Sequence, residues 1–188
     1  MYICNFIGSL LLAYFLAYKC GYFNVMPWAG YAATVANTKC GLDFMTAFLR
    51  GVGCNWLACL AIWLALSAED TISRIFAIWP PIMAFVATGF EHSVANMFFI
   101  PFFIPLGIFV ADDPATTAVL EIAKTYIVNS GGTTGWHNFF TTNLVPVTLG
   151  NIVGAALFVA AIYWYVYINI PLCTPKVSEI KLAQAKKR

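Results

Sequence analysis

The sequence predicts an all-α protein that crosses a membrane several times, and its composition is the first sign. The chain has 188 residues, of which 61% are hydrophobic and only 10% are charged. Soluble domains carry about 25% charged residues. Aromatic residues make up 16% of the chain, many near the ends of apolar runs, as in the aromatic belts of membrane helices. The formal net charge of +2 is small and does not suggest nucleic acid as a partner.

One transmembrane domain is expected over residues 1–170, because its apolar runs are long enough to cross a bilayer. About 20 apolar residues span the hydrocarbon core. Two of the runs are longer than this, so tilting or interruption is expected in them. The stretch between the first two runs is mildly apolar and is expected on the surface. The expected spans are residues 2–18, 44–67, 75–110 (broken) and 139–170.

The C-terminal tail, residues 171–188, is expected to be cytoplasmic. It is basic and carries Lys176, Lys181, Lys186, Lys187 and Arg188. Positively charged segments beside membrane helices stay on the inner side. Counting back through four spans also places Met1 inside, so the sequence predicts a multi-pass protein of the cell (plasma) membrane.

The third span is expected to be interrupted near residues 89–96. Glu91 and His92 lie there within an apolar run, directly after Gly89, and prolines flank the region. Ionisable side chains at membrane depth are costly and normally face a pore, a cavity or a partner. Broken helices are tolerated there only inside protein or along a water-filled path. The interruption therefore favours a transport protein.

An internal repeat relates residues 4–11 to residues 150–157, since both read Asn-x-x-Gly followed by a small residue. On the expected topology the two copies run in opposite directions, which is typical of the inverted repeats of transporters. The alternative is ordinary close contact between helices through small residues. The repeat makes the first span the last helix of an earlier unit, so the chain is expected to be N-terminally truncated.

Three ordered motifs resemble the formate/nitrite transporter family. They are residues 89–101 (Gly-Phe-Glu-His-Ser-Val-Ala-Asn-Met-Phe-Phe-Ile-Pro), residues 50–61 (Arg-Gly-Val-Gly-Cys-Asn-Trp-Leu-Ala-Cys-Leu-Ala) and residues 143–154 (Asn-Leu-Val-Pro-Val-Thr-Leu-Gly-Asn-Ile-Val-Gly). The resemblance covers nearly the whole chain and corresponds to helices three to six, the C-terminal two-thirds of a family member. It implies an aquaporin-like inverted-repeat bundle in a homopentamer, with one pore in each protomer. It also implies that the chain lacks the first two family helices, including a broken one whose threonine faces a central histidine.

His92 is the principal candidate for the substrate path. A mostly neutral imidazole at membrane depth can donate a hydrogen bond to an anion or take part in proton transfer; the alternative is a structural histidine. The resemblance implies that Asn55 bonds and orients this histidine, and that Lys39 attracts the anion from the outer side. Without the resemblance, Asn55 could equally be an interhelical polar contact and Lys39 a solvated lysine.

The other candidates surround the interruption. Asn96 is expected to line the path after the break, and Phe90 lies next to Glu91 in the same motif. Phe85 resembles an aromatic residue of the outer constriction, with a lipid-facing side chain as the alternative. Glu91 would repel an anion if it faced the path. It is therefore expected to point away and to pair with a backbone donor or with a cation in a contact between protomers.

The predicted function is a transmembrane transporter or channel for small monovalent anions, formate first, proton-coupled through the central histidine. The expected partners are formate or a similar anion, protons, the lipid bilayer and further copies in a homopentamer. Alternatives are a nitrite or hydrosulfide channel, or a non-conducting truncated membrane subunit. No enzyme is expected, because no nucleophile-base set is visible. No cofactor or metal is expected either, because six cysteines without a Cys-x-x-Cys pair and two histidines make a poor ligand set. Pairing of Cys20 with Cys40 stays open.

Overall fold

The computed structural model describes residues 1–20, 28–101 and 135–169, and these residues form helices without any strand. Two of the helices, Phe44–Ser67 and Trp136–Tyr167, are long and apolar enough to cross a membrane, and two shorter apolar ones accompany them. The first helices in chain order are α1 (Tyr2–Leu12), continued by η1 (Ala13–Lys19), α2 (Trp28–Cys40), α3 (Phe44–Ser67), α4 (Thr71–Ala87) and α5 (Ser93–Phe99).

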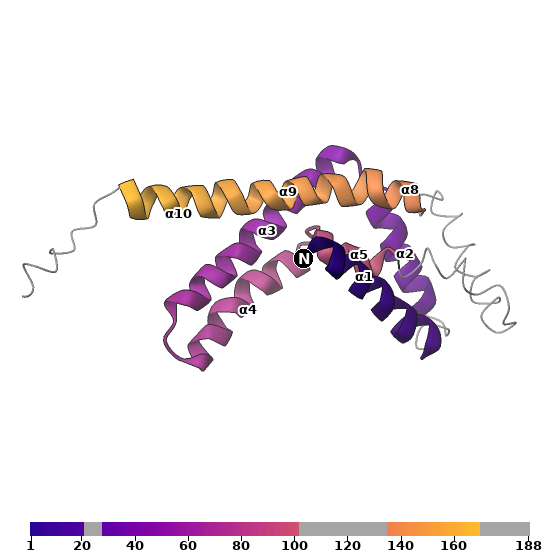
Figure 1. The fold of residues 1–188 in the computed structure, drawn as a ribbon, viewed down its shortest axis with the longest axis horizontal. Coiled ribbons are helices and arrows are strands. Elements are labelled where there is room, and N and C mark those ends of the chain that lie inside the picture. Colours follow the sequence, from indigo (N-terminus) through magenta and orange to yellow (C-terminus); the bar gives the residue numbers. More distant parts are fainter. Residues whose placement is uncertain (21–27, 102–134, 170–188) are drawn as a thin grey trace, which may run out of the picture.

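The C-terminal part of the described chain is one long rod in which α-helical and π-helical turns alternate. Figure 1 shows this rod lying across the other helices, with α3 and α4 running together on one side and α1, α2 and α5 on the other. Its parts are α8 (Trp136–Asn138), η2 (Phe139–Leu144), α9 (Val145–Ala155), η3 (Ala156–Ala161), α10 (Ile162–Trp164) and η4 (Tyr165–Asn169).

Aspartates define the starts of α3 and α4. The Asp43 carboxylate accepts hydrogen bonds from the hydroxyl and the backbone N–H of Thr46, and Asp70 does the same with Ser73. Such caps satisfy backbone donors that the first helical turn leaves free. The hydroxyl and then the amide of Thr46 hold the pKa of Asp43 below its usual value, and those of Ser73 lower the pKa of Asp70. Both carboxylates therefore stay ionised as the pH falls into the mildly acidic range.

Glycines let α3 and α9 cross in close contact. A Cβ atom on Gly150 would collide with the carbonyl oxygen of Phe48, and one on Gly154 would collide with that of Val52. On the facing helix, a Cβ on Gly51 would lie 2.8 Å from the carbonyl oxygen of Val147. Small residues at such crossings allow two backbones to approach where larger side chains would separate them. This glycine seam brings the middle of α9 against the first half of α3.

A small buried core lies where α2, α5 and the start of the rod meet. Phe6 of α1 and Trp136 cover it, and the Phe6 ring lies 6.1 Å from that of Phe139. Elsewhere the helices expose large apolar side chains, as is usual for helices that face lipid or other subunits. The core residues are Cys40, Met97, Ile100, Phe139 and Leu144.

Several boundaries differ from the sequence-based expectation. The stretch between the first two predicted spans contains α2, a helix with little amphipathic pattern. α4, which corresponds to the third predicted span, begins at Thr71 rather than residue 75 because Asp70 caps it. The rod, which corresponds to the last predicted span, begins at Trp136 rather than residue 139. α3 covers the same residues as the second predicted span. Cys20 and Cys40 are both free thiols. Part of the third predicted span and the basic tail lie outside the described residues.

The glycine seam can be tested by adding one side chain to it. Gly150→Val should destabilise the protein by about 2 kcal/mol or more, because overpacking a close contact costs roughly 1–3 kcal/mol. The measurement is thermal unfolding in mild detergent. Gly8→Ala is the matched control, because a Cβ there meets nothing within 4 Å. Equal unfolding temperatures for Gly150→Val and the original chain would contradict the close contact between α3 and α9 at the glycine seam.

Candidate functional site

The site is built around a helix interruption between α4 and α5. Gly89 follows the end of α4 with a positive φ of 69°, which glycine adopts without strain. The N–H of Phe90 then donates to the carbonyl of Phe85 over 3.1 Å, and the N–H of Gly89 donates to that of Val86 over 3.1 Å. This pair of bonds is a Schellman motif, which closes the end of a helix and turns the chain away. The chain resumes as a helix at Ser93.

Asn151 of α9 holds the interrupted backbone in place. Its Nδ2 donates to the carbonyl oxygens of Gly51 at 2.9 Å and Glu91 at 3.0 Å. Its Oδ1 accepts from the N–H of Ser93 at 3.0 Å. One buried amide thus satisfies the backbone groups on both sides of His92 and ties them to α3. Unpaired backbone groups in an apolar interior would each cost several kcal/mol.

The Glu91 carboxylate lies in a buried polar cluster formed with residues from three other elements. It accepts from Lys39 Nζ at 2.8 Å, from Asn96 Nδ2 at 2.6 Å and from Asn143 Nδ2 at 3.4 Å. Only 2% of the Glu91 side chain is exposed, against 18% for Lys39. Asn143 also donates to the backbone carbonyl of Lys39 at 2.9 Å. We call Lys39, Glu91, Asn96 and Asn143 the carboxylate cluster.

The carboxylate cluster changes how two predicted site residues are understood. Glu91 does pair with a cation, but with Lys39 of the same chain rather than across a protomer contact. Because the pair is neutral as a whole, Lys39 attracts a distant anion less than a free lysine would. Asn96 is buried within the cluster, where its Nδ2 donates to Glu91 and to Asn143 Oδ1. The amide is thus part of the structure that holds Glu91.

His92 lies at the first position before α5 and is half-buried. Its Nδ1 accepts a hydrogen bond from the N–H of Ala95 at 3.3 Å. A neutral imidazole that accepts at Nδ1 carries its proton on Nε2. The ring stacks on Phe85 of α4, with centroids 6.3 Å apart and planes at 28°. The structure thus brings together two of the predicted path residues across the break.

Phe90 packs against α3, opposite a glycine. A Cβ atom on Gly53 would lie 2.6 Å from the Phe90 ring, so only glycine leaves room for it there. The ring is half-buried in this position. Phe90 therefore anchors the break against the first half of α3.

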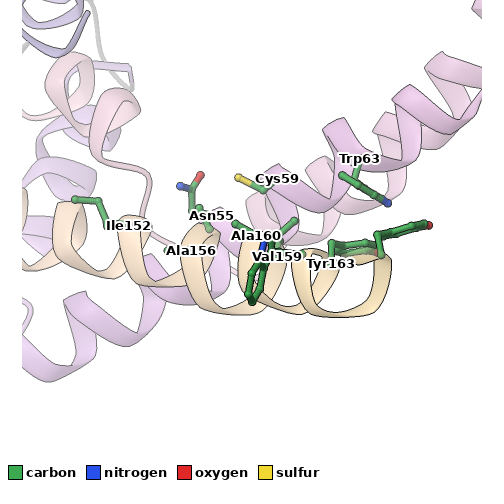
Figure 2. A pocket seen from close by; sticks show the side chains of 11 residues that line it. Asn55, Cys59, Trp63, Ile152, Ala156, Val159, Ala160 and Tyr163 are labelled. Atoms are coloured by element: carbon green, nitrogen blue, oxygen red, sulfur yellow. The ribbon is translucent and has the colours of Figure 1, made fainter. Parts of the chain in front are cut away.

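Asn55 does not bond His92, contrary to the role expected for it. Its Nδ2 donates to the backbone carbonyl of Asn151 at 2.8 Å, which is an interhelical contact between α3 and α9. Asn55 also lines an open, mainly apolar groove of about 720 Å³ between α3 and the rod. Figure 2 shows Cys59, Trp63 and Tyr163 around the same groove. Among the described residues, the hydrogen bond to Asn151 links Asn55 to the break.

Sequence reasoning gave no role to the two amides that organise the site. Asn143 and Asn151 both lie in the motif at residues 143–154, and Asn151 also lies in the internal repeat. Two asparagines on an otherwise apolar helix were a usable signal that these positions bind buried polar groups. Their partners lie tens of residues away in the chain, so the sequence did not show what they bind.

Comparison with known proteins places these features among membrane transport proteins. The profile described as formate/nitrite transporter matches residues 1–165. The "Probable formate transporter" of Methanothermobacter thermautotrophicus is 46% identical, with 89% of this chain and 57% of the relative covered. The "Formate channel FocA" of Escherichia coli (strain K12) is 34% identical, with 90% and 58% covered. These relatives are transporters and channels, as the sequence predicts, and not enzymes.

A solved structure described as a pentameric formate channel with formate bound resembles the fold. Its TM-score is 0.72 at 34% identity, with 89% of this chain and 64% of that chain covered. This chain spans about half the length of the curated relatives it matches. That share is slightly below the two-thirds that the resemblance implied.

The carboxylate cluster predicts strong coupling between Lys39 and Glu91. Lys39→Met should destabilise the protein by about 3 kcal/mol, because removing one partner leaves a buried charge without compensation. Adding Glu91→Gln removes that charge, so the double variant should be more stable than Lys39→Met alone. Thermal unfolding of both single variants and the double variant measures the coupling. Additive effects of the two substitutions would contradict a direct ion pair.

Proposed function

Because the chain belongs to the formate/nitrite transporter family, we propose that it carries small monovalent anions, formate first, across the cell membrane past His92. The resemblance to proteins named as formate transporters and channels supports formate as the substrate. The observation that carries the proposal is the position of His92 at a helix interruption. In this proposal Phe85, Phe90, Lys39, Asn55 and Asn96 shape or support the path around that histidine.

The Nε2–H group of His92 is the proposed contact for the anion. Because Nδ1 is occupied by the N–H of Ala95, the imidazole is held in one orientation with its other nitrogen as a donor. Among the described residues, no partner is assigned to Nε2. A hydrogen bond from such a donor to a carboxylate oxygen is charge-assisted and stronger than a bond between neutral groups. Formate can therefore replace water at this point.

Glu91 does not oppose the anion in this arrangement, although it directly precedes His92. Its carboxylate is taken up by Lys39, Asn96 and Asn143, and it is almost completely buried. The charge is compensated within about 3 Å, so its field outside the cluster is weak. Lys39 then serves as the counter-ion of Glu91, and long-range attraction of the substrate is a lesser role.

The proposed transport step also requires that the anion takes up a proton. An anion that leaves water for an apolar constriction loses several kcal/mol or more of hydration energy. Taking up a proton near His92 converts formate to neutral formic acid, which crosses such a barrier more easily. The histidine either donates this proton or orients the anion while the proton arrives from water. In both cases the imidazole acts at the same atom, Nε2.

The proposed assembly is a homopentamer of aquaporin-like protomers in the lipid bilayer, with the C-terminal tail in the cytoplasm. A resembling structure is described as a pentameric channel, and the helices here expose many apolar side chains that subunits or lipid would cover. The basic residues after position 170 support the orientation. A nitrite or hydrosulfide channel is the nearest alternative, because a single hydrogen-bond donor does not distinguish these small anions.

His92→Asn is the substitution that tests the site directly. Asparagine is a good residue at a helix start and retains an acceptor for a backbone N–H, but it lacks the Nε2 donor. Formate flux should fall at least about tenfold, since a hydrogen bond to a charged group contributes roughly 1.5–3 kcal/mol. The measurement is formate uptake into liposomes that contain the purified chain. Nitrite and hydrosulfide are measured in parallel to rank the substrates.

Ile62→Ala is the matched control for that assay, because Ile62 is exposed on α3 and away from the interruption. It should leave flux unchanged. Absence of anion flux from the well-folded original chain would overturn the transport proposal and would favour a non-conducting subunit. Equal flux in His92→Asn and the original chain would remove His92 from the mechanism.

Proton uptake predicts a dependence on pH with a defined sign. Formate influx under a constant formate gradient should increase as the external pH falls, because protons become more available to form the neutral acid. In His92→Asn the remaining flux should depend less on pH if the histidine takes part in proton transfer. The measurement is uptake at acidic and neutral pH with the internal pH clamped. A flux independent of pH would contradict the proton step while leaving anion transport intact.

A further inference from the structure

A hydrogen bond between two hydroxyl groups joins α1 to the rod. The oxygens of Tyr2 and Thr148 lie 2.5 Å apart, and Thr148 also donates to the carbonyl of Leu144 at 2.6 Å. A hydroxyl has only one hydrogen to donate. Because Thr148 donates to Leu144, the Tyr2 hydroxyl must donate to Thr148. The bonds therefore run in one direction, from Tyr2 through Thr148 to Leu144.

This direction leaves the Tyr2 oxygen as an acceptor. Its hydrogen is committed to Thr148, whereas its lone pairs receive no hydrogen bond within the part of the chain that the structure describes. The Tyr2 residue is 39% exposed, so a small molecule can reach it. An oxygen without a free hydrogen binds O–H or N–H groups but not the oxygens of an anion. Tyr2 thus offers the opposite chemistry to the Nε2 donor of His92.

The internal repeat places this hydroxyl pair in the fold. Tyr2 and Thr148 are 146 positions apart, which is also the offset between residues 4–11 and 150–157. α1 and the rod run in opposite directions in Figure 1. Equivalent residues of two oppositely directed copies touch only beside the axis that relates the copies. Substrate sites of inverted-repeat transporters lie at the interface of the repeats, near the middle of the membrane.

Neighbouring residues on α9 relate the hydroxyl pair to the helix interruption. Thr148 precedes Asn151 by three positions, and residues at this spacing are neighbours on a helix, with about 5–6 Å between their Cβ atoms. Asn151 bonds the backbone groups on both sides of His92. Thr148 also lies one turn before Ile152, which lines the groove between α3 and the rod. On α9, the hydroxyl pair is therefore within about one helical turn of the residues that hold the break and line the groove.

We propose that Tyr2 is a second polar contact on the substrate path and accepts a hydrogen bond from the O–H group of the protonated substrate. The substrate class is a small acid in its neutral form, such as formic acid. This role rests on the proposed function, in which formate takes up a proton near His92. His92 then binds the anion, and the Tyr2 oxygen binds the acid formed from it. Thr148 is a positioning residue, because it takes the Tyr2 hydrogen and leaves the lone pairs of that oxygen to the substrate.

Two substitutions that break the same hydrogen bond test this role. Tyr2→Phe removes the acceptor oxygen, whereas Thr148→Val breaks the bond but leaves that oxygen in place. Formate uptake into liposomes should fall about threefold to tenfold in Tyr2→Phe, which is the effect of one hydrogen bond between neutral groups. In Thr148→Val it should fall by no more than about twofold. Tyr165→Phe, which changes an exposed tyrosine in the last described turn of the rod, is the matched control and should leave uptake unchanged.

Hydrosulfide uptake provides a readout that a purely structural role of Tyr2 would not move. The neutral form of this anion carries S–H groups, which are weak hydrogen-bond donors. Tyr2→Phe should therefore reduce formate uptake at least about twofold more than hydrosulfide uptake. Helix content and a single size-exclusion peak show that each variant is folded, which is expected because phenylalanine retains the ring of an exposed residue.

Three results would overturn the role of Tyr2 and leave the transport proposal intact. The first is an equal loss of formate uptake in Tyr2→Phe and Thr148→Val, which would make the bond only a link between two helices. The second is formate uptake in Tyr2→Phe equal to that of Tyr165→Phe. The third is an equal loss of formate and hydrosulfide uptake in Tyr2→Phe. Absence of uptake by the well-folded original chain would instead overturn both proposals.

Discussion

A broken helix in an apolar interior leaves backbone groups that must find hydrogen-bond partners, and the surrounding helices are arranged to supply them. The interruption exposes backbone groups on both sides of His92, and Asn151 bonds them with both ends of one amide. That amide reaches them only because α9 crosses α3 on glycines, without side chains between the backbones. The Schellman turn at Gly89 directs the chain toward Asn151. The seam, the turn and the amide thus form one unit, and the position of His92 follows from it.

The buried carboxylate of Glu91 imposes a second demand, which explains the position of α2. A bare carboxylate in this environment would be very costly, so a cation must be supplied nearby. Lys39 lies in the last turn of α2 and reaches Glu91 directly, while Asn143 bonds both the carboxylate and the backbone of Lys39. Replacing such a cluster with apolar residues can be neutral for stability. The cluster does join the break, α2 and the start of the rod, and we infer that it fixes their arrangement relative to one another.

The sequence predicts the local features of this fold better than its long-range contacts. The interruption after Gly89 and the helix Phe44–Ser67 follow from apolar runs and a glycine, which are local signals. α2 was missed because its apolar pattern is weak. The predicted hydrogen-bond partner of Asn55, His92, was wrong because an amide on an apolar helix can bond any group that the fold brings near. The bond to the carbonyl of Asn151 joins residues 96 positions apart, and nothing in either local sequence specifies it.

The neutrality of the carboxylate cluster also constrains how an anion is handled beside it. Because Lys39 and Glu91 compensate each other, this ion pair neither attracts nor repels a distant anion strongly. A permanently cationic site would bind formate firmly and release it slowly, whereas conduction needs binding that is easily reversed. In the proposed function, a neutral imidazole with one oriented donor would meet that need, because it would recognise the anion only at short range. Under the proposal of anion transport, the role of the ion pair is to keep its own charges away from the substrate.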